Sequence, residues 1–445
     1  MRFRFTLAVF PALILMAGAG RAALAATPRI VALNPPDGAD DVDPGLTTLE
    51  IQFDQGVFSG AGGVCFDTPG RTSPVTRVGW KASNVFSVTV QLQPDTVYEF
   101  TIGCPENQRF QSPDGEVIEP AKWRFATRGW APPEQQRAIN EAALDEAKQM
   151  LKDFFVHLDR RGIDWERRYE EMRSRILEAP GNAAWMFRMA ELYSIADDPM
   201  VWMMYNGAPI RTNKRPVHLN FRQSAAETTI GPLKKHGDYV YTGRTDDGVG
   251  YLLVYSWHGV PAETIPMFDR VLSDMSDTKA LIVDVRANEG GDAQTAIAVA
   301  SWFVKGEALV LKYRLRDPSQ PSGMSQTFER TIAGNDAPKQ YNKRVAILMG
   351  GKTMGISEWF ILASRHGRRV RTFGAKTRGS SGYGKAKVLS NGVQLCVPSA
   401  RDMLPDGSPM DGITPDHPVE TKDGDFRTSD PVLEAALTAL RKRMK

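Results

Sequence analysis

The stretch Arg344–Phe360, RVAILMGGKTMGISEWF, predicts a buried strand, a turn that contains glycines, and the start of a helix. Val345–Met349 is an unbroken apolar run, which is typical of a strand covered on both faces. Backbone N–H groups at the start of a helix lack intrahelical acceptors, so the turn favours an anionic or carbonyl oxygen. Hydrolases often present a nucleophile on such an elbow, and here the elbow residue is Gly355.

Strand and helix patterns alternate before this elbow. Val249–Tyr255 and Ala280–Val285 predict further buried strands, and Thr264–Met275 and Ala293–Val304 predict helices. This alternation favours a layered α/β core. The second of these strands leads directly into the glycine-containing segment Arg286–Gly291.

Other patterns precede the α/β region. Leu49–Phe53 and Val97–Ile102 alternate apolar and polar residues, as half-buried strands do, and apolar residues recur at helical spacing from Ile139 to Leu158. The chain is therefore predicted to be multidomain, with an N-terminal β-sandwich, a helical segment and an α/β domain. The predicted segments are a signal peptide at 1–25, the β-sandwich at 28–128, the helical segment at 133–203 and the α/β domain at 204–445.

The first 25 residues have the pattern of a cleaved secretion signal. Arg2 and Arg4 precede an apolar run, and Ala23–Ala25 is a small-x-small cleavage site. No later segment reaches the ~20 apolar residues that span a bilayer. Cleavage removes three arginines and no acid, so the formal net charge falls from +3 to 0. We therefore expect a periplasmic or secreted chain with no transmembrane segment, and nothing in its net charge favours nucleic acid or an anionic membrane as partner.

The sequence does not determine whether two of the three cysteines form a disulfide. Cys65 and Cys104 both fall in the predicted β-sandwich, whereas Cys396 lies far from them in sequence. In an oxidising compartment the first two can form a disulfide, but two buried thiols fit the sequence equally well. Histidines after residue 200 show no pairing at metal-ligand spacing, so we expect neither a metal site nor another cofactor.

Five blocks in one order carry a family resemblance. They are GVGYLLVYSW (248–257), KALIVDVRANEGG (279–291), RVAILMGGKTMGISEWF (344–360), FGAKTRGSSGYG (373–384) and DGITPDHPVE (411–420). Together they resemble the tail-specific, or C-terminal-processing, serine peptidases, and most closely the tricorn-like and retinoid-binding-protein-like branch. The resemblance covers about Leu144–Glu420 and implies a crotonase-like α/β core with a helical cap that cuts unfolded or C-terminal peptide segments.

A second resemblance concerns the N-terminal part of the chain. The segments 34–53, 92–103 and 123–127 resemble the bacterial Ig-like domains of exported proteins. This resemblance implies display or adhesion at most, and a structural spacer is the favoured role for such a domain.

The sequence departs from the peptidase pattern at each catalytic position. The family's nucleophilic serine lies three residues before the acid of a Ser-x-x-Glu pattern, and counting back from Glu358 gives Gly355. The base of the tricorn-like branch is the histidine of an Asp-x-His motif, and Met200 stands there. The alternative base is the lysine of a Thr-x-Gly-Lys motif, and Ser380 stands there. Serine peptidase chemistry needs both an activated hydroxyl and a base, so this pattern predicts a degenerate site.

The electrostatic part of the site survives such losses because it uses backbone atoms. By resemblance, the oxyanion hole maps to the N–H groups of Gly290, Gly291 and Ile356. A site that still binds a carbonyl or carboxylate oxygen but cannot attack a peptide bond is a binding site.

Three hypotheses about function follow. The favoured one is an exported member of the family that binds peptide or unfolded protein segments without cutting them. The second is an active serine-type peptidase with a rebuilt site, which uses Ser357 or Ser380 together with Lys385 or a histidine. Against it, a serine at a helix start commonly caps backbone N–H groups, and Lys385 fits a solvated strand end. The third is a cell-surface scaffold that acts through the Ig-like domain.

Overall fold

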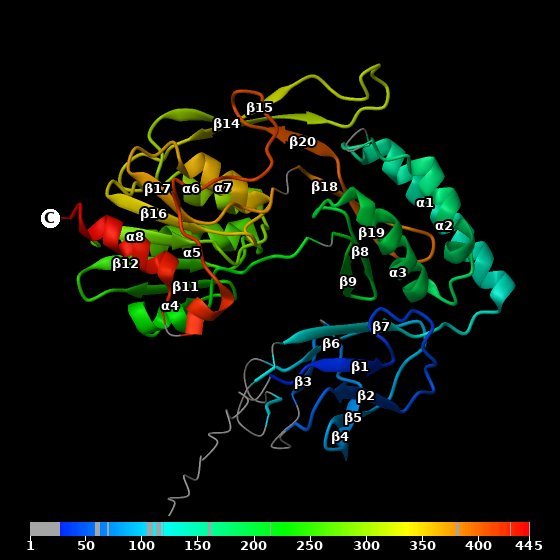
Figure 1. Ribbon diagram of the computed structural model, residues 1–445. Coiled ribbons are helices and arrows are strands. Elements are labelled where there is room, and N and C mark those ends of the chain that lie inside the picture. Colours follow the sequence, from blue (N-terminus) through cyan, green and yellow to red (C-terminus); the bar gives the residue numbers. More distant parts are fainter. Residues whose placement is uncertain are drawn as a thin grey trace, which may run out of the picture. The chain divides into compact units, whose positions relative to one another are not determined.

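The computed structural model describes residues 27–57, 63–68, 71–104, 110–112, 117–118, 120–158, 162–213, 215–379, 382–427 and 429–444. The predicted signal peptide therefore lies outside the described residues. The chain divides into two compact units, which we describe separately (Figure 1). Unit 1 comprises the described residues within 1–39, 45–92 and 98–125, and unit 2 comprises those within 40–44, 93–97 and 126–445.

Unit 1 is built from strands in two sheets. The first sheet has the order β1-β2-β5-β4, with bounds Ile30–Asn34, Thr48–Phe53, Val85–Val90 and Val75–Ala82. The second has the order β3-β6-β7, with bounds Val64–Phe66, Val97–Ile102 and Ala121–Ala126. Aromatic rings fill the interior, since the ring centres of Phe53 and Phe86 each lie 5.0 Å from that of Phe110. Residues that alternate along β2 and β5 are buried, as the sequence pattern predicts.

A disulfide joins Cys65 in β3 to Cys104, which follows β6. The pairing that the sequence left open is therefore present. Cys396, in unit 2, is a buried free cysteine, and burial raises the pKa of its thiol to about 12.

The first long segment of unit 2 is helical. Its helices are α1 (Pro133–Phe154), α2 (Trp165–Leu177) and α3 (Asn182–Tyr193). The Asp164 side chain accepts a hydrogen bond from the Arg167 N–H at 3.0 Å, which caps α2. The apolar faces of these helices share one buried cluster with a sheet of order β18-β19-β8-β9. These strands are Gly384–Val388, Gln394–Pro398, Trp202–Tyr205 and Ala208–Arg211, so the helical and α/β regions belong to one unit.

A seven-stranded sheet forms the centre of unit 2 (Figure 1). Its order is β10-β11-β12-β13-β16-β17-β21, with bounds Lys234–His236, Val240–Arg244, Val249–Val254, Ala280–Asp284, Arg344–Met349, Val370–Gly374 and His417–Pro418. The strands from β12 to β21 run parallel to one another, whereas β10 and β11 are antiparallel. Every residue of β12 and β13 is buried, as their apolar runs predict.

Helices cover both faces of this sheet. Residues of α5 (Pro261–Asp274), α6 (Ala293–Ala300) and α7 (Ile356–Ser364) form one apolar cluster with it, and residues of α4 (Gln223–Ile230) and α8 (Pro431–Arg441) form another. Alternate strand residues face opposite clusters, as Val283 and Ile282 do. The carboxyl ends of β13 and β16 lead towards α6 and α7, which is where open α/β sheets place ligand sites.

A smaller sheet of order β15-β14-β20 packs against α7 through β14. Its strands are Phe328–Ala333, Glu307–Leu315 and Ala400–Met403, and short 3₁₀ helices occupy Ser194–Ala196 and Asp423–Arg427. Asp402 of β20 accepts a hydrogen bond from the Trp359 indole of α7 at 2.8 Å. The small sheet is therefore tied to the helix that begins at the elbow.

Candidate functional site

The elbow residue Gly355 lies after the carboxyl end of β16, at the start of α7. Its φ is +59°, a backbone conformation that residues with side chains rarely adopt. A Cβ atom built on Gly355 would meet only the Glu289 carbonyl oxygen within 4 Å, at 3.7 Å. This is an ordinary van der Waals contact. The elbow therefore has room for a side chain, although its backbone is strained for one.

The glycine turn after β13 lies beside the elbow. A Cβ atom built on Gly290 would lie 3.4 Å from the backbone nitrogen of Ile356. The Gly290 N–H already donates to Asn288 Oδ1 at 2.9 Å. Among the described residues, no acceptor is found for the N–H groups of Gly291 and Ile356. Two of the three expected oxyanion donors thus have no acceptor among the described residues, whereas the donor of Gly290 is occupied.

Glu358 fixes the elbow from inside. It is fully buried, and its Oε2 accepts a hydrogen bond from the Gly355 N–H at 3.1 Å. Its Oε1 accepts from the Gly379 N–H at 3.0 Å and from the Thr377 hydroxyl. The acid of the Ser-x-x-Glu pattern therefore holds the elbow against the loop that leads to Ser380.

Met200, at the expected base position, lies in the loop before β8. Its N–H donates to Asp198 Oδ1 at 2.9 Å. A Cβ atom built on Gly384 would lie 3.1 Å from Met200 Cε and 2.8 Å from Cys396 Sγ, so the methionine packs against the β18–β19 hairpin. No Met200 atom lies within 4 Å of a Cβ at Gly355. The structure does not bring the two family positions into contact.

The side chains of the rebuilt-site hypothesis do not assemble among the described residues. Ser357 is fully buried, and its Oγ accepts a hydrogen bond from Trp257 Nε1 at 3.0 Å. Lys385 is exposed on β18, with Nζ 5.4 Å from the ring centre of Phe154. Ser380 lies outside the described residues. Ser357 thus stabilises the start of α7, and Lys385 is a solvated strand residue.

A serine–histidine pair that the sequence analysis missed lies at the glycine turn. Ser256 Oγ is 2.7 Å from His258 Nδ1 and 3.1 Å from the Gly290 carbonyl oxygen, to which it can donate. His258 is exposed and Ser256 is half-buried. The sequence signal for this pair is a Ser-x-His spacing directly after the apolar strand at 249–254.

Three arginines gather next to the elbow. Arg211 Nη2 lies 2.6 Å from Glu289 Oε2, and Arg215 Nε lies 2.9 Å from Asp197 Oδ2. Arg378 has no carboxylate partner among the described residues, and its Nε is buried without an acceptor there. Burial, followed by repulsion from the other two arginines, lowers the pKa of Arg378. Three cations thus accompany two carboxylates, and the surplus positive charge favours an anionic ligand group.

A second missed feature lies near Met200. His157 Nε2 is 3.9 Å from Asp198 Oδ2, and both residues are buried. The aspartate of the expected Asp-x-His motif therefore faces a histidine from another segment. No local spacing pattern marks this contact, because 41 positions separate the two residues.

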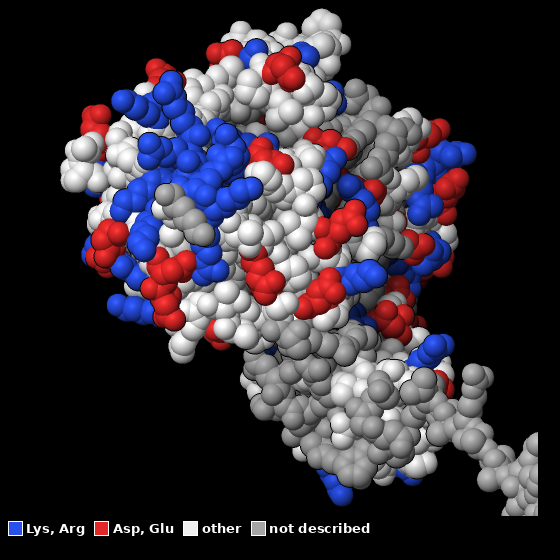
Figure 2. Space-filling model, turned by 60° about the vertical axis from the view of Figure 1, so that its left-hand side comes forward, with Lys and Arg blue, Asp and Glu red and all other residues white. Residues whose placement is uncertain are grey.

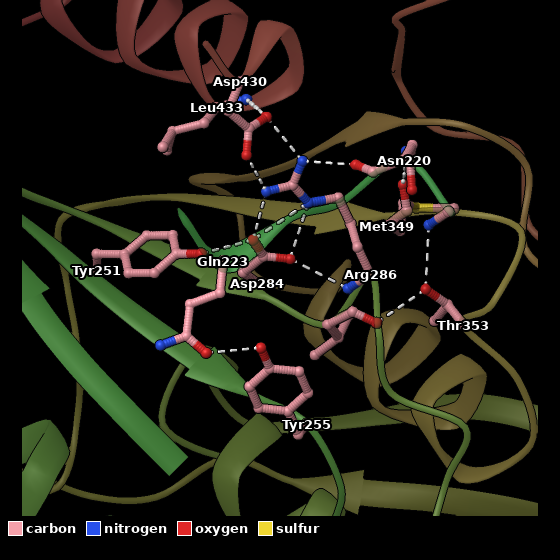
Figure 3. Close-up of polar contacts among 12 residues, drawn as sticks. Asn220, Gln223, Tyr251, Tyr255, Asp284, Arg286, Met349, Thr353, Asp430 and Leu433 are labelled. Carbon is pink, nitrogen blue, oxygen red and sulfur yellow. Dashed lines mark hydrogen bonds and ion pairs between the residues drawn. The ribbon is translucent and has the colours of Figure 1, made fainter. Parts of the chain in front are cut away.

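A fully buried ion cluster supports the glycine turn from within the domain (Figure 3). Arg286 Nη2 lies 2.6 Å from both Asp284 Oδ2 and Asp430 Oδ2, and Nη1 donates to the Asn220 carbonyl oxygen at 2.8 Å. The Tyr251 hydroxyl donates to Asp284 Oδ2 at 2.7 Å, and burial raises the pKa of Tyr251 well above its usual value. Asp284 and Arg286 thus form a structural pair, and Asp430, which the sequence analysis missed, completes the cluster.

Two features are absent from the described part of the chain, a metal-binding cluster and a membrane-spanning helix. Within it, no group of three His, Cys, Asp or Glu side chains is arranged to hold a metal ion. None of its helices combines the length and the apolar character that a membrane crossing requires.

Comparison with known proteins shows a family likeness over part of the chain. Residues 248–419, which include the glycine turn and the elbow, match the sequence profile of peptidase family S41. This part of the chain is therefore similar to peptidase family S41. Over 140 residues, the chain is also 26% identical to a probable CtpA-like serine protease of Staphylococcus haemolyticus. That match covers 31% of this chain and 27% of the relative, so it spans about a quarter of the relative's length.

Solved structures of other proteins are similar to this chain in fold. A putative peptidase from Parabacteroides merdae superposes with a TM-score of 0.59 at 19% identity, over 68% of this chain and 96% of that one. Mature CPAF superposes with a TM-score of 0.52 at 11% identity, over 69% of this chain and 97% of that one. These likenesses concern the fold alone.

Proposed function

We propose that this protein binds a peptide segment at the elbow and does not cleave it. The observation that carries the proposal is Gly355, which occupies the elbow without a nucleophile. The positions of the two expected bases, Met200 and Ser380, also carry no side chain that accepts a proton near neutral pH. A peptidase that lacks nucleophile and base retains only its binding groups.

The remaining groups favour the carboxylate at the C-terminus of a peptide. The N–H groups of Gly291 and Ile356 offer two backbone donors. Arg378 offers a guanidinium with no carboxylate partner among the described residues. Its Nη2 already donates to Asn213 Oδ1 and to the Arg215 carbonyl oxygen, so its positive charge is what attracts a carboxylate. A carboxylate oxygen on the two backbone donors, close to this cation, is the arrangement that we propose.

The test compares two fluorescent ten-residue peptides that differ only in a free or amidated C-terminus. We expect the wild-type chain to bind the free acid at least tenfold more tightly than the amide, as measured by anisotropy. Arg378→Gln should remove most of this preference, whereas Arg137→Gln, an exposed control on α1, should keep it. Equal binding of both peptides to the wild-type chain would exclude the carboxylate, and shortened peptide in the mass spectrum would exclude a pure binding role.

Serine-type hydrolysis is the second candidate function, and one contact favours it. Ser256 Oγ lies 2.7 Å from His258 Nδ1, which is the distance between a nucleophile and a general base. The pair contacts the Gly290 carbonyl, at the turn that also carries the Gly291 donor. The opposing observation is that the same hydroxyl accepts from the His258 N–H at 3.1 Å, as in a local turn.

A fluorophosphonate probe separates the two functions. Under the binding proposal, the purified chain stays unlabelled. Stoichiometric labelling that Ser256→Ala abolishes and Ser357→Ala preserves would instead establish hydrolysis by the pair. Labelling at Ser380 would restore the original rebuilt-site hypothesis.

We also propose the finer architecture and the compartment. The two sheets of unit 1 support an Ig-like β-sandwich, and the sheet covered by helices on both faces supports a crotonase-like core. The signal-like N-terminus and the Cys65–Cys104 disulfide support export to an oxidising compartment such as the periplasm. Cell fractionation tests the location, because we expect a chain that begins at about Ala26 outside the cytoplasm.

A further inference from the structure

The Lys and Arg side chains of unit 2 are not evenly distributed. Figure 2 shows a large group of them on the face that carries the end of α8. We name the group formed by six of these cations the basic edge. Its members, from three separate segments, are Arg344, Arg368, Arg369, Arg371, Lys442 and Arg443, of which Arg344 is half-buried and the other five are exposed.

The topology explains why these segments meet. Arg344 is the first residue of β16, and the Arg369 carbonyl accepts a hydrogen bond from the Val345 N–H at 3.0 Å. Asp430, the residue before α8, lies next to the carboxyl end of β13. The last residue of α8, Arg441, contacts Asp247 before β12 at 2.7 Å. α8 therefore runs back along the parallel strands. Its end reaches the amino edge of the sheet, where β16 and β17 begin.

The basic edge lies at the opposite end of β16 from the elbow. Six residues in a strand span about 20 Å, since each advances the chain by ~3.3 Å. A surface bound at the basic edge therefore leaves the elbow accessible from the other side.

The six cations have no described carboxylate partner within 4.0 Å, whereas Arg441 and Arg365 beside them are paired with Asp247 and Asp416. None of the large apolar side chains that are exposed in the described chain lies on the segments that form the edge. A protein partner usually needs apolar or aromatic anchors at the centre of its interface, and single-stranded nucleic acid needs aromatic rings for stacking. A surface of charge alone fits electrostatic adsorption to lipid headgroups.

We propose that the basic edge docks on the phosphate groups of an anionic lipid surface. Guanidinium groups suit this role because they pair with phosphate oxygens through two hydrogen bonds. The net charge of the chain conceals this surface, since acids elsewhere balance the clustered cations. The net charge by itself therefore gives no reason to expect an anionic membrane as partner, whereas the clustering of the cations does. Docking at this edge holds the chain on the surface with the elbow pointing away from it.

The test uses the full mature chain and sedimentation with vesicles. We expect binding to vesicles with 30% phosphatidylglycerol, little binding to pure phosphatidylcholine, and at least tenfold weaker binding when salt rises from 50 to 500 mM. The triple change Arg368→Glu, Arg369→Glu and Arg371→Glu should weaken binding at least tenfold. A matched triple change at exposed cations elsewhere, Arg137→Glu, Lys234→Glu and Lys387→Glu, should weaken it less than threefold.

A second variant keeps the proposal testable if the triple variant misfolds. Lys442→Glu with Arg443→Glu changes only the chain end after α8 and should weaken binding about threefold to tenfold. Equal losses in the patch and control triples would overturn the proposal, because net charge would then explain the binding. Absence of binding to anionic vesicles, or tighter binding to single-stranded DNA than to them, would also overturn it.

Discussion

Arg286 Nη2 lies 2.6 Å from Asp430 Oδ2, although 144 positions separate the two residues in sequence. Both side chains are fully buried. Asp430 also caps α8, because its Oδ1 accepts a hydrogen bond from the Leu433 N–H at 3.0 Å. One carboxylate therefore fixes both the C-terminal helix and the arginine behind the glycine turn. The geometry of the site thus depends on a helix that contributes no ligand-binding group.

We predict that Asp430→Ala lowers the free energy of unfolding by about 3–5 kcal/mol, because it leaves a buried guanidinium short of one of its two carboxylates. Asp164→Ala removes a helix cap of the same type on α2, where no buried cation is involved. This control substitution should lower the free energy of unfolding by only about 1 kcal/mol. Urea unfolding monitored by tryptophan fluorescence measures both values, and equal losses would show that Asp430 acts as a cap alone.

The sequence predicted those features that depend on local patterns. The observed β16 spans Arg344–Met349, against an apolar run at Val345–Met349, because burial on both faces determines the residues of the strand. The helix expected at Thr264–Met275 begins earlier, at Pro261, since proline is compatible with the first turn. Contacts between distant segments left no such pattern. Asp430 is an ordinary helix cap in sequence, and only the fold brings it to Arg286.

The candidate site also combines features that local patterns predict with features that depend on contacts between distant segments. The Asp284–Gly291 motif and the Ser-x-x-Glu spacing located the two turns, because each turn requires particular residues at fixed spacing. Arg378 lacks a carboxylate partner among the described residues, and the N–H of Gly290 is occupied; both facts depend on side-chain positions that spacing does not determine. The basic edge escaped detection for a related reason, since three segments supply it and the net charge averages over all of them.

Asp402 should make stability depend on pH. It is 2% exposed, and burial raises its pKa to about 6, although hydrogen bonds from Trp359 and Gly382 and the nearby Arg330 oppose this shift. The folded pKa lies above the unfolded value of about 4, so the unfolded chain loses its proton first as pH rises. The free energy of unfolding attributable to Asp402 therefore falls by about 2–3 kcal/mol between pH 4 and pH 6 and is constant above that.

Asp402→Asn removes this ionisation and keeps an oxygen for the Trp359 indole. From pH 4 to pH 7, the wild-type chain loses the contribution of Asp402 and the variant does not. The unfolding free energy of the variant should therefore show a gain of about 2–3 kcal/mol relative to that of the wild-type chain. Thermal unfolding at several pH values measures this difference. Asp406→Asn, at an exposed turn, is the matched control and should show no such gain. A parallel pH dependence of the wild-type and Asp402→Asn chains would show that Asp402 does not titrate in this range.

The Cys65–Cys104 disulfide closes a loop with a sequence separation of 39. Loop-closure entropy predicts that Cys65→Ser with Cys104→Ser lowers the stability of unit 1 by about 3–4 kcal/mol. Unit 2 has its own apolar clusters, so its unfolding transition should change little. Limited proteolysis with mass spectrometry resolves the two units. Equal destabilisation of both would show that they unfold together.

Two substitutions test whether the missing nucleophile and base can be restored. Gly355→Ser introduces a hydroxyl where a Cβ has room, but its φ of +59° should cost about 1 kcal/mol in stability. Met200→His places an imidazole after Asp198, in the family's Asp-x-His order. If the loop before β8 can bring this imidazole to the elbow, the double variant acquires both nucleophile and base, and neither single variant suffices. We therefore expect fluorophosphonate labelling at position 355 and slow hydrolysis of unfolded protein in the double variant only.

A further change tests whether the gain uses the proposed site. Gly291→Pro removes one of the two proposed backbone donors and should abolish hydrolysis by the double variant. Because Gly291 has a φ of +136° and proline requires a negative φ, its folding must be verified by circular dichroism. Arg378→Gln in the same background is a milder change that should weaken peptide binding but leave probe labelling intact. A folded double variant that stays unlabelled would mean that Met200 is too far from the elbow for its replacement to act as the base.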